Sequence, residues 1–131
     1  MKESIKTLLT QAILQSPSAD NSQPWQVNWQ DNTINIQYDT RRVSGQTFPP
    51  TSPATLLSIG AAIENLTQAA AAYSVKISPH PPKPFNPNNV IYYTADILTL
   101  DTNVKIPDTP IALFQRHTNR LPYQAKPLAK T

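Results

Sequence analysis

Proline is the residue that most constrains this chain, because 14 of its 131 residues are proline and only two, Gly45 and Gly60, are glycine. Proline fixes φ and lacks an N–H group, so it ends helices and interrupts central strands. The five prolines between positions 79 and 87 therefore predict a stiff, extended connector. The two glycines cannot form a G-x-G-x-x-G or G-x-x-x-x-G-K loop, so side chains must hold any bound phosphate.

Hydrophobic periodicity predicts a helix and a hairpin before this connector. Apolar side chains recur three and four residues apart over residues 5–13, a pattern typical of an amphipathic helix that ends at Ser16-Pro17. Over residues 25–38 apolar and polar side chains alternate, with a turn at Asp31-Asn32, which predicts a β-hairpin with one buried face. Trp25 and Trp29 are expected to anchor a core or an interface.

A long helix is predicted from Ser52 to about Tyr73, with Ser52 as N-cap and Pro53 at the first helical position. Its many small residues suit close packing in a core or at a subunit interface, and a homodimer with residues 60–62 near its centre is expected. A short strand near residue 76, a longer one over 90–100 and a short helix over 111–115 follow. Together these elements predict an α+β fold with a mostly antiparallel sheet.

Charge and composition exclude several classes of function. Eleven Lys and Arg against eight Asp and Glu give a net charge of +3, but only Arg41 and Arg42 are adjacent, so nucleic acid is not an expected partner. Cysteine is absent, and His80 and His117 have no metal-ligand spacing, so no metal site is expected. The sequence lacks a signal-like N-terminus and any long apolar run, which predicts a cytoplasmic protein without a membrane partner.

Two segments carry groups that can bind a ligand. Residues 16–25 place hydroxyls, amides and backbone N–H groups in one turn, held at both ends by Pro17 and Pro24. A rigid array of neutral donors and acceptors suits a flavin ring, although Ser, Asp and Asn are also ordinary turn residues.

The second segment is Arg116-His117-Thr118-Asn119-Arg120. Two guanidinium groups flanking a hydroxyl can hold a phosphate, which the scarcity of glycine requires of side chains. The alternative is a solvated helix end with scattered basic residues.

Both segments resemble motifs of the flavin-dependent nitroreductase family. The first, Ser-Pro-Ser-x-x-Asn-Ser-Gln-Pro-Trp, is very similar to the family's turn against the isoalloxazine ring. The second, R-x-[S/T]-x-R-x-x-[aromatic], resembles the motif for the phosphate of flavin mononucleotide (FMN). The helix over 52–73 resembles the family's long interface helix. Because the Arg motif follows the turn, the order resembles the first repeat of the tandem Acg-type branch, with residues 1–109 as one nitroreductase-like unit and 110–131 as the start of a second, apparently truncated one.

The resemblance implies an FMN-dependent oxidoreductase of nitroreductase-like α+β fold that takes hydride from NAD(P)H. The acceptor is left open as a small molecule such as a nitro compound or a quinone. A flavin-binding or flavin-sequestering protein without turnover, and a pseudo-domain that pairs with another chain, are the alternatives. The unit would act as a homodimer or together with a second repeat. No catalytic side chain is identified, and the implied cofactor-binding residues are Ser16, Pro17, Ser18, Asn21, Gln23, Arg116, Thr118 and Arg120.

Overall fold

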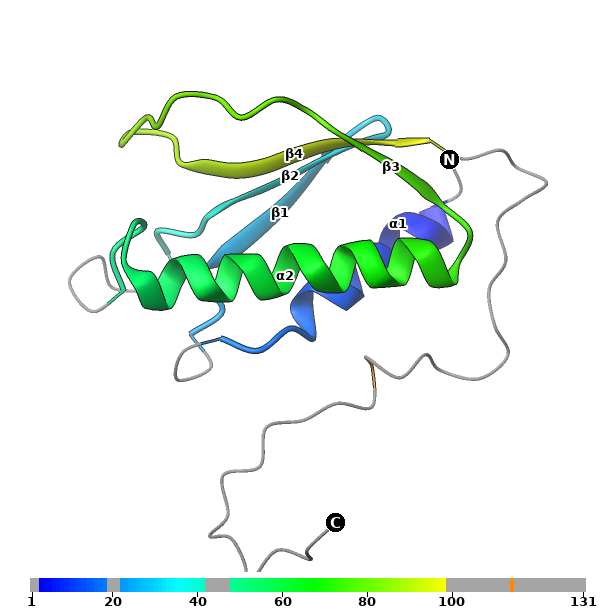
Figure 1. Cartoon of the computed structure of the whole chain (residues 1–131), viewed down its shortest axis with the longest axis horizontal. Helices are drawn as coiled ribbons and strands as arrows, with labels where there is room; N and C mark the ends of the chain where they lie inside the picture. The colour runs from blue at the N-terminus through cyan, green and yellow to red at the C-terminus, as the bar shows by residue number, and fades with distance from the viewer. Residues whose placement is uncertain (1–2, 19–21, 42–47, 99–113, 115–131) are drawn as a thin grey trace, which may run out of the picture.

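The computed structural model describes residues 3–18, 22–41, 48–98 and 114 of the chain. Two helices lie on one face of a four-stranded sheet in which every neighbouring pair of strands is antiparallel (Figure 1). The strands have the spatial order β1-β2-β4-β3. This arrangement confirms the predicted α+β class. The elements are α1 (Glu3–Leu14), β1 (Trp25–Gln30), β2 (Thr33–Tyr38), α2 (Pro53–Ala72), β3 (Lys76–Pro79) and β4 (Ile91–Leu98).

The hairpin of β1 and β2 has the register that its alternating sequence predicts. Trp25 pairs with Tyr38 at the open end and Gln30 pairs with Thr33 at the closed end. Asp31 adopts a φ of 52° in the two-residue turn, a left-handed conformation that Asp tolerates better than most residues. Every second side chain of the hairpin therefore faces the helices.

Helix α2 begins as its sequence predicts. The Ser52 hydroxyl accepts a hydrogen bond from the Thr55 N–H at 3.2 Å, and Pro53 occupies the first turn. The helix ends at Ala72, and Ser74 follows with a φ of 58°. The predicted bounds of this helix are thus confirmed.

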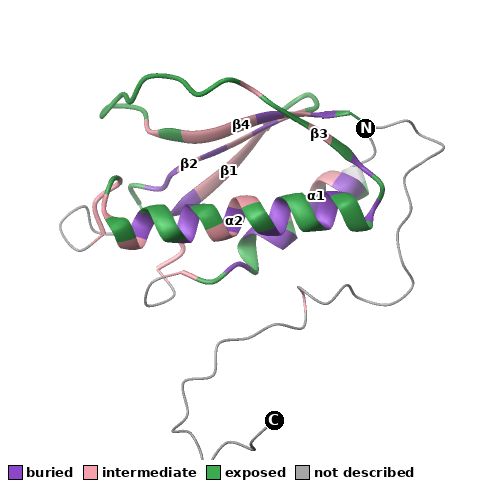
Figure 2. Cartoon of the chain, viewed as in Figure 1, coloured by how far each residue is buried: buried purple, intermediate pink, exposed green. Residues whose placement is uncertain are grey.

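A single hydrophobic core lies between the helices and the sheet, as the buried residues in Figure 2 show. Its members lie on α1, β1, β2, α2 and β4 or directly flank an element, and Ile77 of β3 packs against them half-buried. The core consists of Ile5, Leu9, Ala12, Ile13, Trp25, Ile34, Ile36, Ile59, Ala62, Leu66, Ala69, Ala70, Tyr73, Val75, Ala95 and Ile97.

The proline-rich connector joins β3 to β4 along the outside of the sheet (Figure 1). Residues 81–89 are exposed, and backbone hydrogen bonds fix both ends: His80 N–H donates to the Thr94 carbonyl at 2.8 Å, and Tyr38 N–H donates to the Val90 carbonyl at 3.0 Å. Of the helix predicted over 111–115 only Phe114 is described, and it packs against the core. Within the described ranges no helix is long and apolar enough to cross a membrane.

Candidate functional site

The turn that carries most of the predicted cofactor residues connects α1 to β1 at one end of the sheet (Figure 1). A hydrogen bond from the Asp39 N–H to the Pro24 carbonyl, 2.9 Å long, joins this turn to the residue that follows β2. Pro24 is fully buried, so the last residues of the turn are fixed to the sheet. The helix, the hairpin and the start of the loop after β2 thus meet at one place.

Ser16 caps the end of α1. Its hydroxyl donates to the Ile13 carbonyl at 2.7 Å, and its backbone N–H donates to the same carbonyl at 3.0 Å. Ser16 is also buried, with 5% of its surface exposed. Because its hydroxyl hydrogen is already donated, Ser16 can offer a ligand only an acceptor in this arrangement.

Ser18 and Gln23 close the turn across five residues. The Gln23 N–H donates to the Ser18 hydroxyl at 3.0 Å, and Gln23 has a φ of 50°. A left-handed glutamine is uncommon, and the surrounding contacts must offset its cost of about 1–3 kcal/mol. Since Ser18 accepts this bond, its own O–H hydrogen can donate to a further acceptor. Pro17, between the two serines, is exposed.

Two buried polar atoms at the end of the turn have no hydrogen-bond partner in the described part of the chain. They are the hydroxyl oxygen Oγ of Ser22 and the indole nitrogen Nε1 of Trp25. Trp25 is 2% exposed, so water does not replace the missing acceptor over an open surface. A buried polar group without a partner costs about 1–3 kcal/mol, and most such groups in native proteins do have one. The turn therefore offers at least two groups for a partner that the described chain does not supply.

Sequence reasoning did not single out Ser22 or Trp25 as contact residues. Ser22 belongs to the motif over residues 16–25 but is not among its predicted contact residues. Trp25 is predicted to be an anchor, and its burial confirms this. No sequence signal distinguishes a bonded hydroxyl or indole from an unpaired one, because that depends on what packs around the turn. The burial of these atoms is a result of the tertiary structure alone.

The remaining predicted contacts lie outside the described residues. These are Asn21 in the turn and the phosphate-binding set Arg116, Thr118 and Arg120. Their roles, and the meeting of the turn with the Arg segment, stay predictions. The predicted absence of a metal site is also a prediction, although no cluster of three or more potential ligands occurs among the described residues.

Just after β2, Arg41 places a positive charge close to Asp39, the residue that is bonded to the turn over residues 16–25. The Arg41 N–H donates to the Asp39 carboxylate at 2.9 Å, and the Arg41 Nε lies 3.7 Å from the same oxygen. Asp39 is buried, whereas 78% of the Arg41 side chain is exposed. The buried carboxylate therefore has a local counter-charge, and the side chains of the turn's described polar residues, Ser16, Ser18, Ser22 and Gln23, are neutral.

Comparison with known proteins identifies the fold. No protein-family model matches the sequence, and no curated protein is similar to it. Solved structures are similar: a provisionally named NADH oxidase from Clostridium acetobutylicum has a TM-score of 0.59 at 15% identity, covering 92% of this chain and 90% of that one. The chain thus shares its fold with that structure.

Two further solved structures are similar to the chain over most of its length. A provisionally named NADH dehydrogenase or NAD(P)H nitroreductase from Parabacteroides distasonis has a TM-score of 0.59 at 16% identity, covering 91% of this chain and 86% of that one. A provisionally named nitroreductase from Desulfovibrio desulfuricans, solved with FMN, has a TM-score of 0.58 at 15% identity, covering 93% and 87%. The chain therefore has the nitroreductase fold.

Proposed function

We propose that the chain is a nitroreductase-like oxidoreductase and that the turn over residues 16–25 lies against the ring of bound FMN. The observation that carries this proposal is a pair of buried atoms in the turn, Ser22 Oγ and Trp25 Nε1, that find no hydrogen-bond partner among the described residues. They occur in a fold shared with a protein solved in complex with FMN. The motif that resembles the ring-side turn of nitroreductases is the same segment.

The chemistry of the turn fits a flavin ring. An isoalloxazine presents carbonyl oxygens and ring nitrogens, which are hydrogen-bond acceptors, and one N–H donor. The hydroxyl of Ser18 can donate, that of Ser16 can accept, and Ser22 has no partner among the described residues. The hydrogen bonds of the Ser16 and Ser18 hydroxyls join backbone groups and no charged side chain, as suits a neutral ring. In the proposal the ring contacts come from Ser16, Pro17, Ser18, Asn21 and Gln23, and the phosphate contacts from Arg116, Thr118 and Arg120.

Bound FMN would supply the hydride-transfer chemistry, and the protein would supply binding, orientation and electrostatics. The proposed electron donor is NAD(P)H, and the proposed acceptor is a small molecule such as a nitro compound or a quinone. Hydrogen bonds at both ends of the turn contribute to this role directly. Since the cap at Ser16 and the link from Asp39 to Pro24 fix these ends, the hydroxyl of Ser16 is oriented before the cofactor binds.

One visible spectrum tests the proposal and its two alternatives. The full chain, purified after expression with riboflavin, is expected to absorb in the flavin region and to release FMN on denaturation. Anaerobic NAD(P)H is expected to bleach this absorbance. A yellow protein that resists bleaching indicates the flavin-binding or flavin-sequestering alternative, and a colourless protein that takes up no added FMN indicates the pseudo-domain.

Single substitutions separate the two halves of the proposed site. Arg120→Ala removes a charge-assisted contact and is expected to weaken FMN binding about ten- to a hundredfold. Ser22→Ala is expected to weaken FMN binding about two- to tenfold. The stability of the cofactor-free protein should stay equal or rise, because the variant removes a buried hydroxyl that has no partner among the described residues. Ser78→Ala on exposed β3 is the control. Unchanged FMN affinity in both site variants would contradict the proposal.

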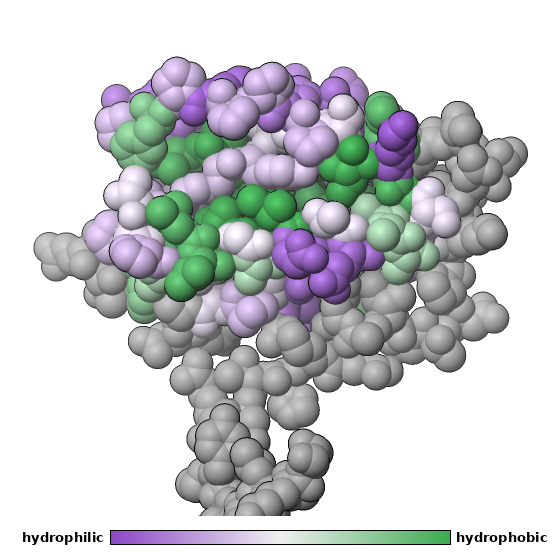
Figure 3. Space-filling view, viewed as in Figure 1, coloured by the Kyte–Doolittle hydropathy of each residue, from purple (hydrophilic) through white to green (hydrophobic). Residues whose placement is uncertain are grey.

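We also propose that the outer surface of α2 forms a homodimer contact. Leu56 and Leu57, next to the start of the helix, are 48% and 76% exposed. Hydrophobic side chains gather over the N-terminal half of α2, and hydrophilic ones lie further along it (Figure 3). Exposed leucines next to each other favour contact with another chain.

The structure corrects one detail of the expected interface. Ala62 is fully buried in the core of the subunit, so it does not face a partner, whereas Gly60 is exposed. The surface to test is therefore Leu57. Leu57→Glu is expected to convert a dimer to a monomer in light scattering, with Thr67→Glu on the exposed side of the same helix as control. A wild-type chain that is monomeric at high concentration and still binds FMN tightly would refute this contact.

A further inference from the structure

The face of the sheet turned away from the helices carries mainly polar, mostly uncharged side chains, with Ile91 and Leu98 as exposed apolar exceptions. Cross-strand neighbours on this face are joined by side-chain hydrogen bonds. Gln37 donates to Gln26 at 3.1 Å, across β1 and β2. Between β2 and β4, Thr94 donates to Asn35 at 2.6 Å and Thr33 donates to Asp96 at 2.7 Å. In each case the two residues lie directly opposite each other on neighbouring strands. These residues are half-buried. The face is thus an ordered polar surface and belongs to neither the core nor the proposed flavin turn.

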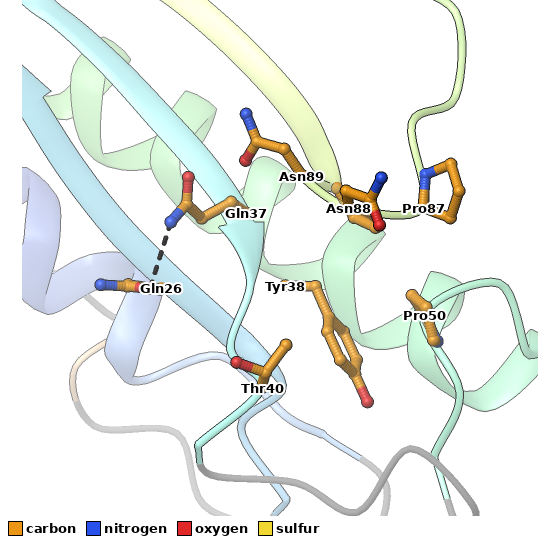
Figure 4. A pocket seen from close by; sticks show the side chains of 9 residues that line it. Gln26, Gln37, Tyr38, Thr40, Pro50, Pro87, Asn88 and Asn89 are labelled. Carbon is orange, nitrogen blue, oxygen red and sulfur yellow. Dashed lines mark hydrogen bonds between the residues drawn. The ribbon is translucent and has the colours of Figure 1, made fainter.

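A pocket of 230 Å³ lies at one end of this face (Figure 4). Three segments contribute to it: the hairpin, the loop between β2 and α2, and the end of the proline-rich connector. The lining residues are Gln26, Gln37, Tyr38, Thr40, Pro50, Pro87, Asn88, Asn89 and Val90. The volume is below the roughly 300–1,000 Å³ typical for drug-sized ligands, so it suits a single small ring system.

Hydrogen bonds donated by two tyrosines hold the walls of the pocket in place. The Tyr38 N–H binds the Val90 carbonyl at 3.0 Å, and the Tyr38 hydroxyl donates to the Phe48 carbonyl at 2.7 Å. The Tyr92 hydroxyl donates to the Pro50 carbonyl at 2.8 Å. Burial raises the pKa of the Tyr38 hydroxyl, so it stays protonated and keeps donating at neutral pH. The three segments are therefore held in place without a ligand.

The lining contains four carboxamides and no charged side chain. An ionised ligand would lose water here without gaining a counter-charge, so the pocket favours an uncharged group. In the Gln26–Gln37 pair, Gln37 donates and Gln26 accepts, which leaves the NH2 group of Gln26 as a donor and the carbonyl of Gln37 as an acceptor (Figure 4). Interchanging the nitrogen and oxygen of both amides leaves the same combination. The side chains of Asn88 and Asn89 form no hydrogen bond with the described residues and add the same two kinds of group.

We propose that this pocket binds the edge of a cyclic amide, in which an N–H lies next to a carbonyl, as in a lactam-type nucleobase. Such an edge needs one acceptor and one donor side by side, and carboxamide side chains read base edges in this way. The bond between Gln26 and Gln37 orients both amides in advance, which lowers the ordering cost of binding. This site shares no lining residue with the proposed FMN turn, and its ligand class follows from the lining alone.

Uridine is a suitable probe, with N3-methyluridine and ribose as matched ligands. In titrations followed by protein NMR, uridine is expected to shift the side-chain amide signals of Gln26, Gln37 and Asn89, while N3-methyluridine, which lacks the N–H, binds at least tenfold more weakly. Ribose is expected to cause no shift. Equal binding of the methylated compound, or equal shifts with ribose, would overturn the ligand class, and no shift with millimolar uridine would overturn the site.

Variants test the residues. Gln37→Ala is expected to weaken uridine binding about three- to tenfold, as for loss of a neutral hydrogen bond. Asn89→Ala, on the exposed connector where folding is not at risk, is expected to weaken it severalfold, and Asn28→Ala, on β1 outside the pocket, is the control. Unchanged affinity in both pocket variants would overturn the assignment. The titrations are repeated with FMN: competition would place the base in the flavin site instead, whereas uridine binding without any FMN binding would sink only the proposed function.

Discussion

The buried side chain of Asn65 provides the sharpest test of how the helices position the turn over residues 16–25. Its amide donates to the Ala12 carbonyl at 2.9 Å, and both residues are buried. The last carbonyls of a helix lack partners within the helix. The Ser16 N–H, which could continue α1 by binding Ala12, binds Ile13 instead. Asn65 therefore supplies the partner that the end of α1 would otherwise lack.

Asn65→Ala leaves the Ala12 carbonyl buried without a donor. This should lower the free energy of unfolding by about 1–3 kcal/mol. The loss of free energy is measurable by urea titration. In a domain of this size it corresponds to a decrease in Tm of about 4–12 °C, measurable by circular dichroism during heating. Thr67→Ala removes a hydroxyl that donates to its own helix at an exposed position, and its effect should stay within about 0.5 kcal/mol. If the two variants were equally stable, Asn65 would not satisfy the end of α1 as described.

Two further predictions concern α2 and the outer sheet face. Gly60→Ala should raise the unfolding free energy by up to about 1 kcal/mol, because Gly60 is helical and exposed and an added Cβ would meet no atom within 4 Å. A loss of stability in urea denaturation would instead mean that another chain fills that space. Hydrogen bonds from Thr33 and His80 lower the pKa of Asp96, so its stabilising contribution is present above the ordinary carboxyl pKa and disappears as pH falls through the lowered value. The Tm difference between the wild type and Asp96→Asn should therefore shrink on acidification from about pH 6 to about pH 3, and a constant difference would contradict this account.

The elements of the fold follow from local sequence. The apolar spacing of residues 5–13 is sufficient for α1, and alternation with a two-residue turn is sufficient for the β1–β2 hairpin. Ser52 and Pro53 specify where α2 begins, because capping and a preset φ act within one turn of the chain. These signals depend on neighbours a few residues apart, so no tertiary information is needed to read them.

The candidate site was only partly readable from the sequence. The segment over residues 16–25 could be chosen from its motif and its flanking prolines, and the structure describes Ser16, Pro17, Ser18 and Gln23 of the residues predicted there. Which of their groups are already bonded could not be predicted. Ser16 uses its hydroxyl hydrogen to cap α1, whereas the Oγ of Ser22 is buried with no partner in the part of the chain that the structure describes, although the two residues have the same side chain.

What the sequence determined by itself is the set of elements, their approximate bounds and the segment that resembles a flavin-binding turn. What only the tertiary structure decided is which strands are neighbours and which polar groups meet. The pocket shows this, because Asn89 is brought to the hairpin pair Gln26 and Gln37 by the pairing of β2 with β4 and by the bond from Tyr38 to Val90. Local patterns act over one turn of helix or two residues of strand, whereas these contacts join residues far apart in the chain, and only the packing of the whole core fixes them.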